Sequence, residues 1–208
     1  MTLAADTSAP AVSAIFERRA DPLRALADQA RALADAARAM AARFQAGGKL
    51  IVFGSGGTCT DAQHVAVEFV HPVIVGKRAL PAVSLTSDVA TLTGVAERHG
   101  LAEVFAHQLR LLAEPGDIAL GLSPDGDTAH VLRGLIHARG QGLLTVALLG
   151  GDGGAVVARG AAEHVLLARS DDSRVVKEVH VTAYHILWEL VHVFLEHPGA
   201  LESGAVRP

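Results

Sequence analysis

Five short apolar runs alternate with helical patterns along most of this chain, and this alternation constrains its fold more than any other feature. The runs predict strands at residues 50–54, 81–86, 117–123, 143–150 and 164–169. They are apolar at odd and even positions alike, as is typical of a parallel sheet covered by helices on both faces. The helical patterns cover residues 59–71, 88–97, 101–113, 127–139, 154–160 and 173–196. We therefore predict a single α/β domain with an open, five-stranded parallel sheet and right-handed crossovers.

A long helix is predicted ahead of the first strand. Asp21 and Pro22 are typical of a helix start, and Gly47-Gly48 is typical of a helix end. Between them, apolar residues recur at alternating steps of four and three: Leu26, Ala30, Leu33, Ala37, Met40 and Phe44. A stripe this regular packs either on its own domain or on a second copy of the chain.

The chain is therefore divided into four predicted parts. Residues 1–12 form a mobile N-terminus, 13–47 a helical extension, 48–197 the α/β domain and 198–208 a C-terminal tail.

Composition limits the partners and the compartment. Half of the 208 residues are hydrophobic, which is enough for a sizeable core. A net charge of −4 gives no electrostatic reason to expect nucleic acid or an anionic membrane. The single cysteine, Cys59, agrees with a reducing compartment, and we see no secretory signal or membrane span. We expect a soluble, cytoplasmic protein.

Three loops that follow predicted strands are rich in residues that bind anions. They are residues 54–58, 86–88 and 123–128, which contain mainly Gly, Ser, Thr and Asp. In a parallel sheet such loops meet at the carboxyl edge, where backbone amides at helix N-termini favour an anion. Each loop alone is more typical of an ordinary turn or helix cap, but three at one edge indicate a binding site. The glycine loop lacks the spacing of a P-loop or a dinucleotide site, so a nucleotide is not indicated.

Two histidines and a glutamate are candidates for chemistry. His64 and Glu68 lie four residues apart in one predicted helix, so both project toward a shared metal or substrate or are simply solvated neighbours. We expect them to face the same pocket as the glycine loop. His185 lies in the apolar segment AYHILWELVHVF, where a histidine is more often a hydrogen-bonded core residue than a ligand.

The segment GSGGTCTDAQHVAVEF resembles a segment of bacterial phosphoheptose isomerases, a branch of the sugar isomerase (SIS) domain family. The resemblance continues through LPAVSLTSDVATLTGVAERHG, EVFAHQL, PGDIALGLS and SDDSRVVKEVHVTAYHILWELV, and covers about residues 48–195. It implies a homotetrameric aldose–ketose isomerase that acts on sedoheptulose 7-phosphate through an enediol, with sites formed between subunits.

The resemblance also implies roles for particular residues. Glu68 corresponds to the base and His185 to the acid, and His64, Glu68 and His185 correspond to zinc ligands. The residues expected at the substrate are Ser55, Gly56, Gly57, Thr58, Asp88, Ser123, Asp125, Thr128 and Lys177.

Lys177 departs from the family pattern, because it stands where a glutamine ligates zinc. A protonated ammonium cannot donate a lone pair to a metal. Either three ligands hold zinc and leave an open position, or Lys177 takes over the electrostatic role of the cation. Its ammonium would also be suited to pair with Glu68 and keep it ionised.

Asp125 and Asp127 depart from the pattern as well, because they stand where neutral donors are expected to meet a phosphate. Carboxylates repel that dianion, so the substrate is either an altered phosphosugar, or a polyol or nucleotide-linked sugar that lacks the terminal phosphate. A non-catalytic, sugar-phosphate-binding regulatory or assembly protein on the same fold is the alternative function. Retention of His64, Glu68 and His185 favours the enzyme.

Overall fold

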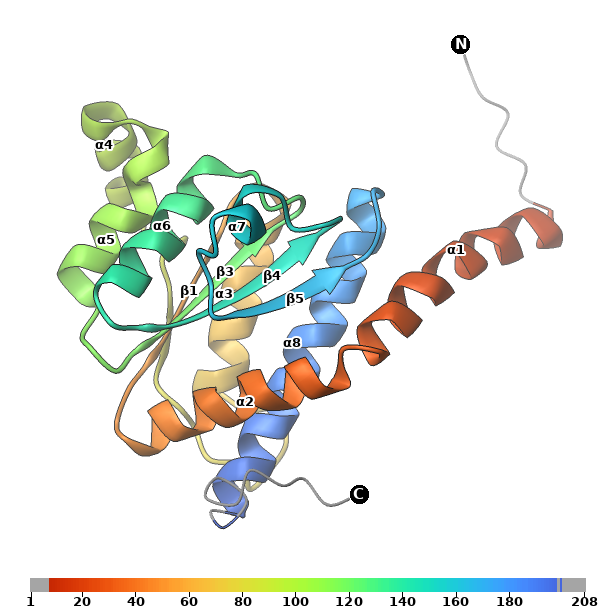
Figure 1. Cartoon of the computed structure of the whole chain (residues 1–208), viewed down its shortest axis with the longest axis horizontal. Helices are drawn as coiled ribbons and strands as arrows, with labels where there is room; N and C mark the ends of the chain where they lie inside the picture. The colour runs from red at the N-terminus through yellow and green to blue at the C-terminus, as the bar shows by residue number, and fades with distance from the viewer. Residues whose placement is uncertain (1–7, 198, 200–208) are drawn as a thin grey trace.

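The computed structural model describes residues 8–197 and residue 199 (Figure 1). The strands are β1 (Leu50–Gly54), β2 (Ala82–Ser84), β3 (Ile118–Ser123), β4 (Leu144–Gly150) and β5 (His164–Ala168). The helices are α1 (Ala9–Ala27), α2 (Ala30–Gln45), α3 (Gly57–Val70), α4 (Val89–His99), α5 (Val104–Leu112), α6 (Ala129–Gly140), α7 (Gly154–Ala158) and α8 (Ser173–Glu196), with a 3₁₀ turn, η1 (Leu101–Glu103), before α5. All strands pair in parallel in the order β2-β1-β3-β4-β5, which confirms the predicted α/β class.

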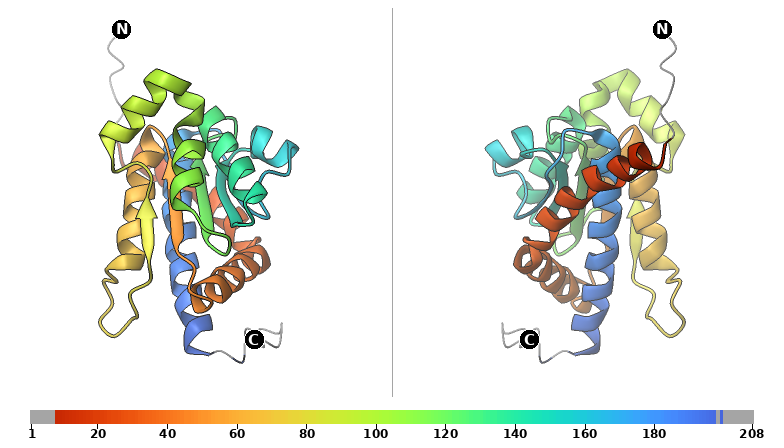
Figure 2. Two further views of the ribbon diagram at one scale, coloured as in Figure 1. Left: turned by 90° about the vertical axis from the view of Figure 1, so that its left-hand side faces the viewer. Right: turned by 90° about the vertical axis from the view of Figure 1, so that its right-hand side faces the viewer.

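Alternate residues of each strand supply two separate cores. Leu50 and Val52 of β1 belong to the core beneath α2, α3 and α8. Ile51 and Phe53, one position along, belong to the core beneath α4, α5, α6 and α7. Figure 2 shows helices on both sides of the sheet. The near absence of polar residues in the strands follows from this double burial.

The strand order places a ligand-binding crevice beside β1. From β1 the chain adds β2 on one side and then crosses over to add β3, β4 and β5 on the other. At such a switch point, the loops after β1 and β3 lead to helices that diverge, and ligands bind in the crevice between them. Those are the glycine loop and the Ser123 loop of the sequence analysis.

The predicted single N-terminal helix is wrong in its start and its continuity. It begins at Ala9, because Ser8 accepts a hydrogen bond from the amide of Ala11, and Pro22 lies inside it rather than at its start. It breaks before Ala30, where Gln29 turns toward the free edge of the sheet. The Gln29 side chain donates to the carbonyl of Leu167 at 2.8 Å and accepts from the amide of Leu167 at 2.9 Å. This contact satisfies edge groups of β5 that no further strand covers.

The break also shifts the apolar stripe. Leu26, Leu33, Met40 and Phe44 are buried as predicted, whereas Ala30, next to the break, is exposed. Of the predicted N-terminal segment 1–12, residues 1–7 lie outside the described residues and the helix occupies the rest from Ala9. Nearly all of the predicted tail 198–208 also lies outside them, and the division of the chain into parts stays a prediction. No helix in the described part of the chain has the length and apolar character needed to cross a membrane.

Candidate active site

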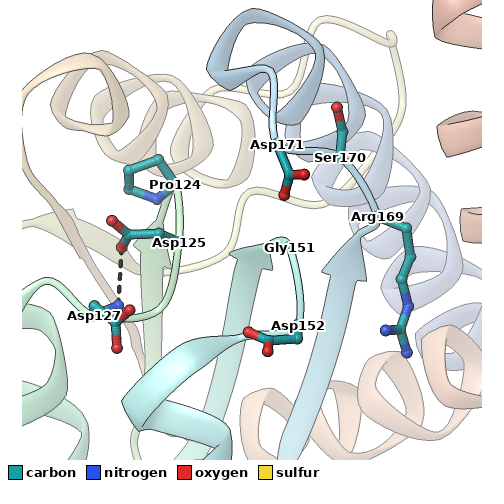
Figure 3. Close-up of a pocket in the computed structure, with 8 residues that line it drawn as sticks. All are labelled: Pro124, Asp125, Asp127, Gly151, Asp152, Arg169, Ser170 and Asp171. Carbon is teal, nitrogen blue, oxygen red and sulfur yellow. Dashed lines mark hydrogen bonds between the residues drawn. The ribbon is translucent and has the colours of Figure 1, made fainter.

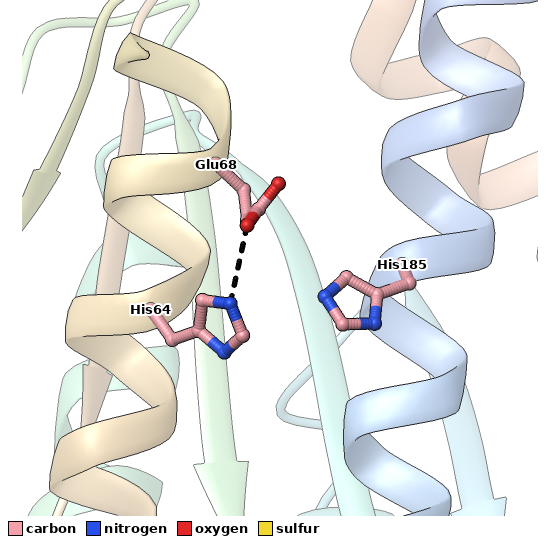
Figure 4. Close-up of side chains that lie close together, drawn as sticks. All are labelled: His64, Glu68 and His185. Carbon is pink, nitrogen blue, oxygen red and sulfur yellow. Dashed lines mark hydrogen bonds and ion pairs between the residues drawn. The ribbon is translucent and has the colours of Figure 1, made fainter. Parts of the chain in front are cut away.

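His64, Glu68 and His185 form a compact group between α3 and α8 (Figure 4). Nε2 of His64 lies 3.2 Å from Oε1 of Glu68, one helical turn along α3. The ring of His185 approaches from α8, with its centroid 5.3 Å from that of His64. One ligand atom from each residue lies within 4.8 Å of the other two. The structure therefore brings these three predicted residues together from two separate helices.

His185 is exposed, so the core role that its apolar context favours is wrong. The buried histidines of α8 are His180 and His192, which are 1% and 2% exposed. Both ring nitrogens of His192 lie within hydrogen-bond distance of main-chain oxygens, those of Trp188 and Arg78. His185 instead projects toward α3 and stays free for chemistry.

The three side chains have the chemistry of a metal site. Two imidazoles and a carboxylate are ligands that Zn²⁺ takes in proteins, and three of them leave a position open. Their ligand atoms lie within 4.8 Å of one another, close enough for side-chain rotations to bring all three to one ion. His71 is not part of the group; it lies at the C-terminal end of α3.

Lys177 does not reach Glu68. Its ammonium lies 2.6 Å from Oδ1 of Asp61, 2.9 Å from the carbonyl of Gly57 and 3.2 Å from Oγ1 of Thr60. The Asp61 side chain is only 5% exposed, so this cation compensates a buried carboxylate of α3. The pairing of Lys177 with Glu68 that the sequence left open is therefore not formed, and Lys177 joins α8 to α3 instead.

The glycine loop is a tight turn that holds itself together. Gly56 has a φ of +56°, which side-chain-bearing residues rarely adopt. A Cβ on Gly54 would lie 2.6 Å from Oγ1 of Thr58. That hydroxyl accepts from the amide of Ser55 and donates to the carbonyl of Ser55, both at 2.9 Å. The Thr58 hydroxyl and the amides of Ser55 and Thr58 are thus engaged in the turn. Ser55, Gly57 and Thr58 line a cavity.

This cavity has a volume of about 290 Å³. Its lining comes from the glycine loop, the β3 loop and the start of α8: Ser55, Gly57, Thr58, Pro124, Ser173, Arg174, Val176, Lys177 and His180. Arg174 is paired with Asp172, as Lys177 is with Asp61. Burial lowers the pKa of His180 to about 4, although the nearby carbonyl of Leu149 acts in the opposite direction, so the imidazole is neutral at pH 7.

The β3 loop is closed by its own carboxylate. Oδ1 of Asp125 accepts from the hydroxyl of Ser123 at 3.0 Å and from the amide of Asp127 at 2.9 Å. Oγ of Ser123 also accepts from the amide of Gly126 and lies 3.0 Å from Oγ1 of Thr128. Asp125 therefore occupies donors that the resemblance assigns to a phosphate.

An acidic cavity of about 550 Å³ lies next to this loop, beyond the ends of β3, β4 and β5 (Figure 3). It is lined by Pro124, Asp125, Asp127, Gly151, Asp152, Arg169, Ser170 and Asp171. Asp127 accepts from the amide of Ala155 and Asp152 from that of Gly154, so both carboxylates hold the turn before α7.

Asp88 is not brought to any of these cavities. It caps α4, where its carboxylate accepts from the amide and the hydroxyl of Thr91. Those hydrogen bonds lower the pKa of Asp88. In a single chain Asp88 is therefore a helix cap.

The histidine–glutamate group and the glycine loop do not share one hollow in a single chain. Glu68 and His185 line a separate cavity of about 440 Å³. Its other lining residues are Val73, Ile74, Lys77, Trp188, Glu189 and Val193. The expectation of a common pocket is not met within a single chain.

Three residues at the site were not singled out from the sequence: Asp61, Tyr184 and Trp188. Oη of Tyr184 lies 2.8 Å from Nδ1 of His64, and Nε1 of Trp188 donates to the carbonyl of Glu68 at 2.9 Å. Burial raises the pKa of the Tyr184 hydroxyl above its usual range. Helical spacing could have found Asp61, because it precedes His64 by about one turn, whereas Tyr184 and Trp188 look like core residues of an apolar helix.

The fold and this arrangement define a class of protein. A model of the SIS domain matches residues 16–150, so the chain belongs to the SIS domain family. Within it, the chain is 35% identical over 161 residues to a phosphoheptose isomerase of Thermodesulfovibrio yellowstonii, covering 77% of this chain and 79% of that protein. It is 42% identical over 154 residues to a phosphoheptose isomerase of Chlorobium phaeobacteroides, covering 73% and 67%.

Solved structures agree with these relatives. The structure of a phosphoheptose isomerase from Francisella tularensis matches with a TM-score of 0.83 and 30% identity, covering 90% of this chain and 99% of that one. The enzyme from Neisseria gonorrhoeae matches with a TM-score of 0.80 and 27% identity, covering 86% and 96%. The chain is thus an enzyme of the SIS domain family, and the relatives named above, to which it is similar, are isomerases.

Proposed function

We propose that this protein is an aldose–ketose isomerase of a phosphosugar, with sedoheptulose 7-phosphate as the reference substrate. The observation that carries the proposal is the approach of Glu68 and His185 from two helices at the wall of one cavity. The phosphoheptose isomerases to which the chain is similar support the sugar class.

The geometry suits the proton transfers of this reaction. Glu68 removes a proton from the carbon that bears the hydroxyl group, while His185 protonates the carbonyl oxygen beside it to give an enediol. Glu68 then returns its proton to the neighbouring carbon, and His185 takes the proton of the other hydroxyl as the new carbonyl forms. The hydrogen bond from Trp188 to the carbonyl of Glu68 and the ring contact of His185 with His64 hold the two groups close to each other.

We propose Zn²⁺ as the ion that His64, Glu68 and His185 bind. The support is a ligand set of two imidazoles and a carboxylate whose donor atoms lie within 4.8 Å of one another. Bound zinc would act as a Lewis acid on the two substrate oxygens. Lys177 is no ligand in this proposal, because Asp61 holds its ammonium.

We also propose that the protein works as a homotetramer in the cytoplasm, with sites completed between subunits. The separation of the glycine loop from the Glu68 cavity supports a shared site, since a second copy would supply the missing wall. Val73, Ile74 and Val75 beside that cavity are 73%, 51% and 101% exposed, as expected of a surface that another subunit covers. The single cysteine supports a reducing compartment.

Turnover of sedoheptulose 7-phosphate, measured with and without added Zn²⁺, tests the proposal. Glu68→Gln is expected to abolish turnover, whereas Glu189→Gln, which removes another carboxylate from the same cavity, is expected to retain it. Binding of ketose phosphates without any turnover would instead favour the alternative function, a non-catalytic regulatory or assembly protein. The observation that favours this alternative is Asp125, whose carboxylate accepts hydrogen bonds from Ser123 and Asp127 in the β3 loop.

A further inference from the structure

Tyr184 is a buried side chain that borders the proposed active site. It is 2% exposed, and its ring packs edge-on against both imidazoles, 5.4 Å from that of His64 and 4.8 Å from that of His185. Among the described residues, the one hydrogen-bond partner of its hydroxyl is Nδ1 of His64, at 2.8 Å. Nothing in the proposed proton transfers requires this phenol.

The two ring nitrogens of His64 face different partners. Nδ1 faces Tyr184, and Nε2 faces Oε1 of Glu68 at 3.2 Å. A carboxylate accepts but does not donate, so in the metal-free protein a neutral His64 carries its proton on Nε2 and donates it to Glu68. Nδ1 is then an acceptor, and the Tyr184 hydroxyl donates to it.

Metal binding requires the opposite tautomer. A ligand nitrogen offers a lone pair, so coordination through Nε2 moves the ring proton to Nδ1, where it needs an acceptor. A carbonyl or a carboxylate at Nδ1 would satisfy this state alone. A hydroxyl both donates and accepts, so Tyr184 satisfies both states by rotating its O–H bond.

We propose that Tyr184 is the positioning residue of His64. Its hydroxyl holds the imidazole in place in both tautomers, so that Nε2 can donate to Glu68 without metal and can bind the metal ion when it is present. This inference rests on the proposed metal site. Without the hydroxyl, metal binding leaves the Nδ1–H without this acceptor, and partners of this kind are typically worth 10- to 100-fold in metal affinity.

The test is Zn²⁺ affinity, measured by competition with a chromophoric chelator, for the wild type and Tyr184→Phe. The expected result is a 10- to 100-fold weaker affinity in the variant. Thr182→Val is the matched control, since it removes a hydroxyl of the same helix whose one hydrogen-bond partner among the described residues is the carbonyl of Glu178. Its affinity should stay within about twofold of the wild type. A folded Tyr184→Phe protein with wild-type affinity overturns the inference.

A second measurement depends neither on enzyme activity nor on the Tyr184→Phe protein. ¹⁵N NMR of the wild-type protein, with His64 assigned by comparison with His64→Gln, should show the proton on Nε2 without metal and on Nδ1 with Zn²⁺. A proton that stays on Nδ1 in the metal-free protein contradicts the inference. A wild type that binds no Zn²⁺ overturns this inference and removes the metal from the proposed function, whereas the isomerase activity is tested separately by turnover.

Discussion

The carboxylate of Asp125 is expected to weaken binding of a phosphorylated substrate, and Asp125→Asn should strengthen it. Asp125 accepts hydrogen bonds from the hydroxyl of Ser123 and the amide of Asp127, which are the donors a phosphate would need. A phosphate that enters this loop must displace the carboxylate and still lie close to its charge. Asparagine keeps the shape and the accepting oxygen but removes that charge.

The size of the effect follows from the exposure of the loop. Two like unit charges about 4 Å apart repel by about 4 kcal/mol at an effective dielectric of about 20, and by about 1 kcal/mol in bulk water. Asp125 is exposed, so the value lies toward the water limit, at about 1–2 kcal/mol. Since 1.4 kcal/mol corresponds to a factor of ten, this is about 5- to 30-fold in affinity.

The assay is steady-state isomerisation of sedoheptulose 7-phosphate by the wild type and the variant. We expect KM to fall about 5- to 30-fold in Asp125→Asn with kcat nearly unchanged. The removed charge acts on the phosphate equally in the bound substrate and in the transition state. The gain should shrink at high salt, which screens exposed charges. Asp152→Asn, which removes a charge from the same acidic cavity but not from these donors, should change KM far less. An unchanged or higher KM in Asp125→Asn would refute the reasoning.

Three further outcomes follow from the packing around α3 and α8. Lys177→Met should lower the free energy of unfolding in urea by about 2 kcal/mol, because Asp61 is left buried without its cation, and adding Asp61→Asn should restore part of the loss. Gly54→Ala should cost about 1–3 kcal/mol in the same assay, because its Cβ would meet the side chain of Thr58; an unaltered midpoint would contradict the tight turn. Burial holds the pKa of His180 near 4, whereas an unfolded histidine titrates near 6.5, so the unfolded state binds the extra proton between these values. Stability should therefore fall by up to about 1.4 kcal/mol per pH unit from pH 6.5 down to 4, and His180→Leu should flatten that slope.

Most of the fold could be predicted because its determinants are local. The run at 50–54 and the pattern at 173–196 coincide with β1 and α8, since buried strands and amphipathic helices have distinct periods. The break at Gln29 could not be predicted in this way. Its cause is a hydrogen bond to Leu167, which is distant in sequence and adjacent only in the folded sheet.

The residues of the site also differ in whether local sequence or a distant contact determines their place. His64 and Glu68 share a face by helical spacing alone, and the structure keeps them together. The partner of Lys177 could not be chosen, because Asp61 and Glu68 lie two turns apart on one face of α3 and only the register of α8 selects between them. Nor could Tyr184 be recognised as a residue of the site, because a tyrosine in an apolar helix is typical of a core residue. Only the structure shows Nδ1 of His64 beside its hydroxyl.

Transfer of solvent hydrogen into the product tests the central claim that the Glu68 carboxylate moves the proton between the two carbons. With sedoheptulose 7-phosphate in D₂O, the wild type should place deuterium on the second carbon of the aldose product, as seen by NMR. Glu68→Gln should slow this incorporation by about 10²- to 10⁴-fold, the usual contribution of a general base, while Glu189→Gln retains it. Incorporation by Glu68→Gln at the wild-type rate would contradict the account.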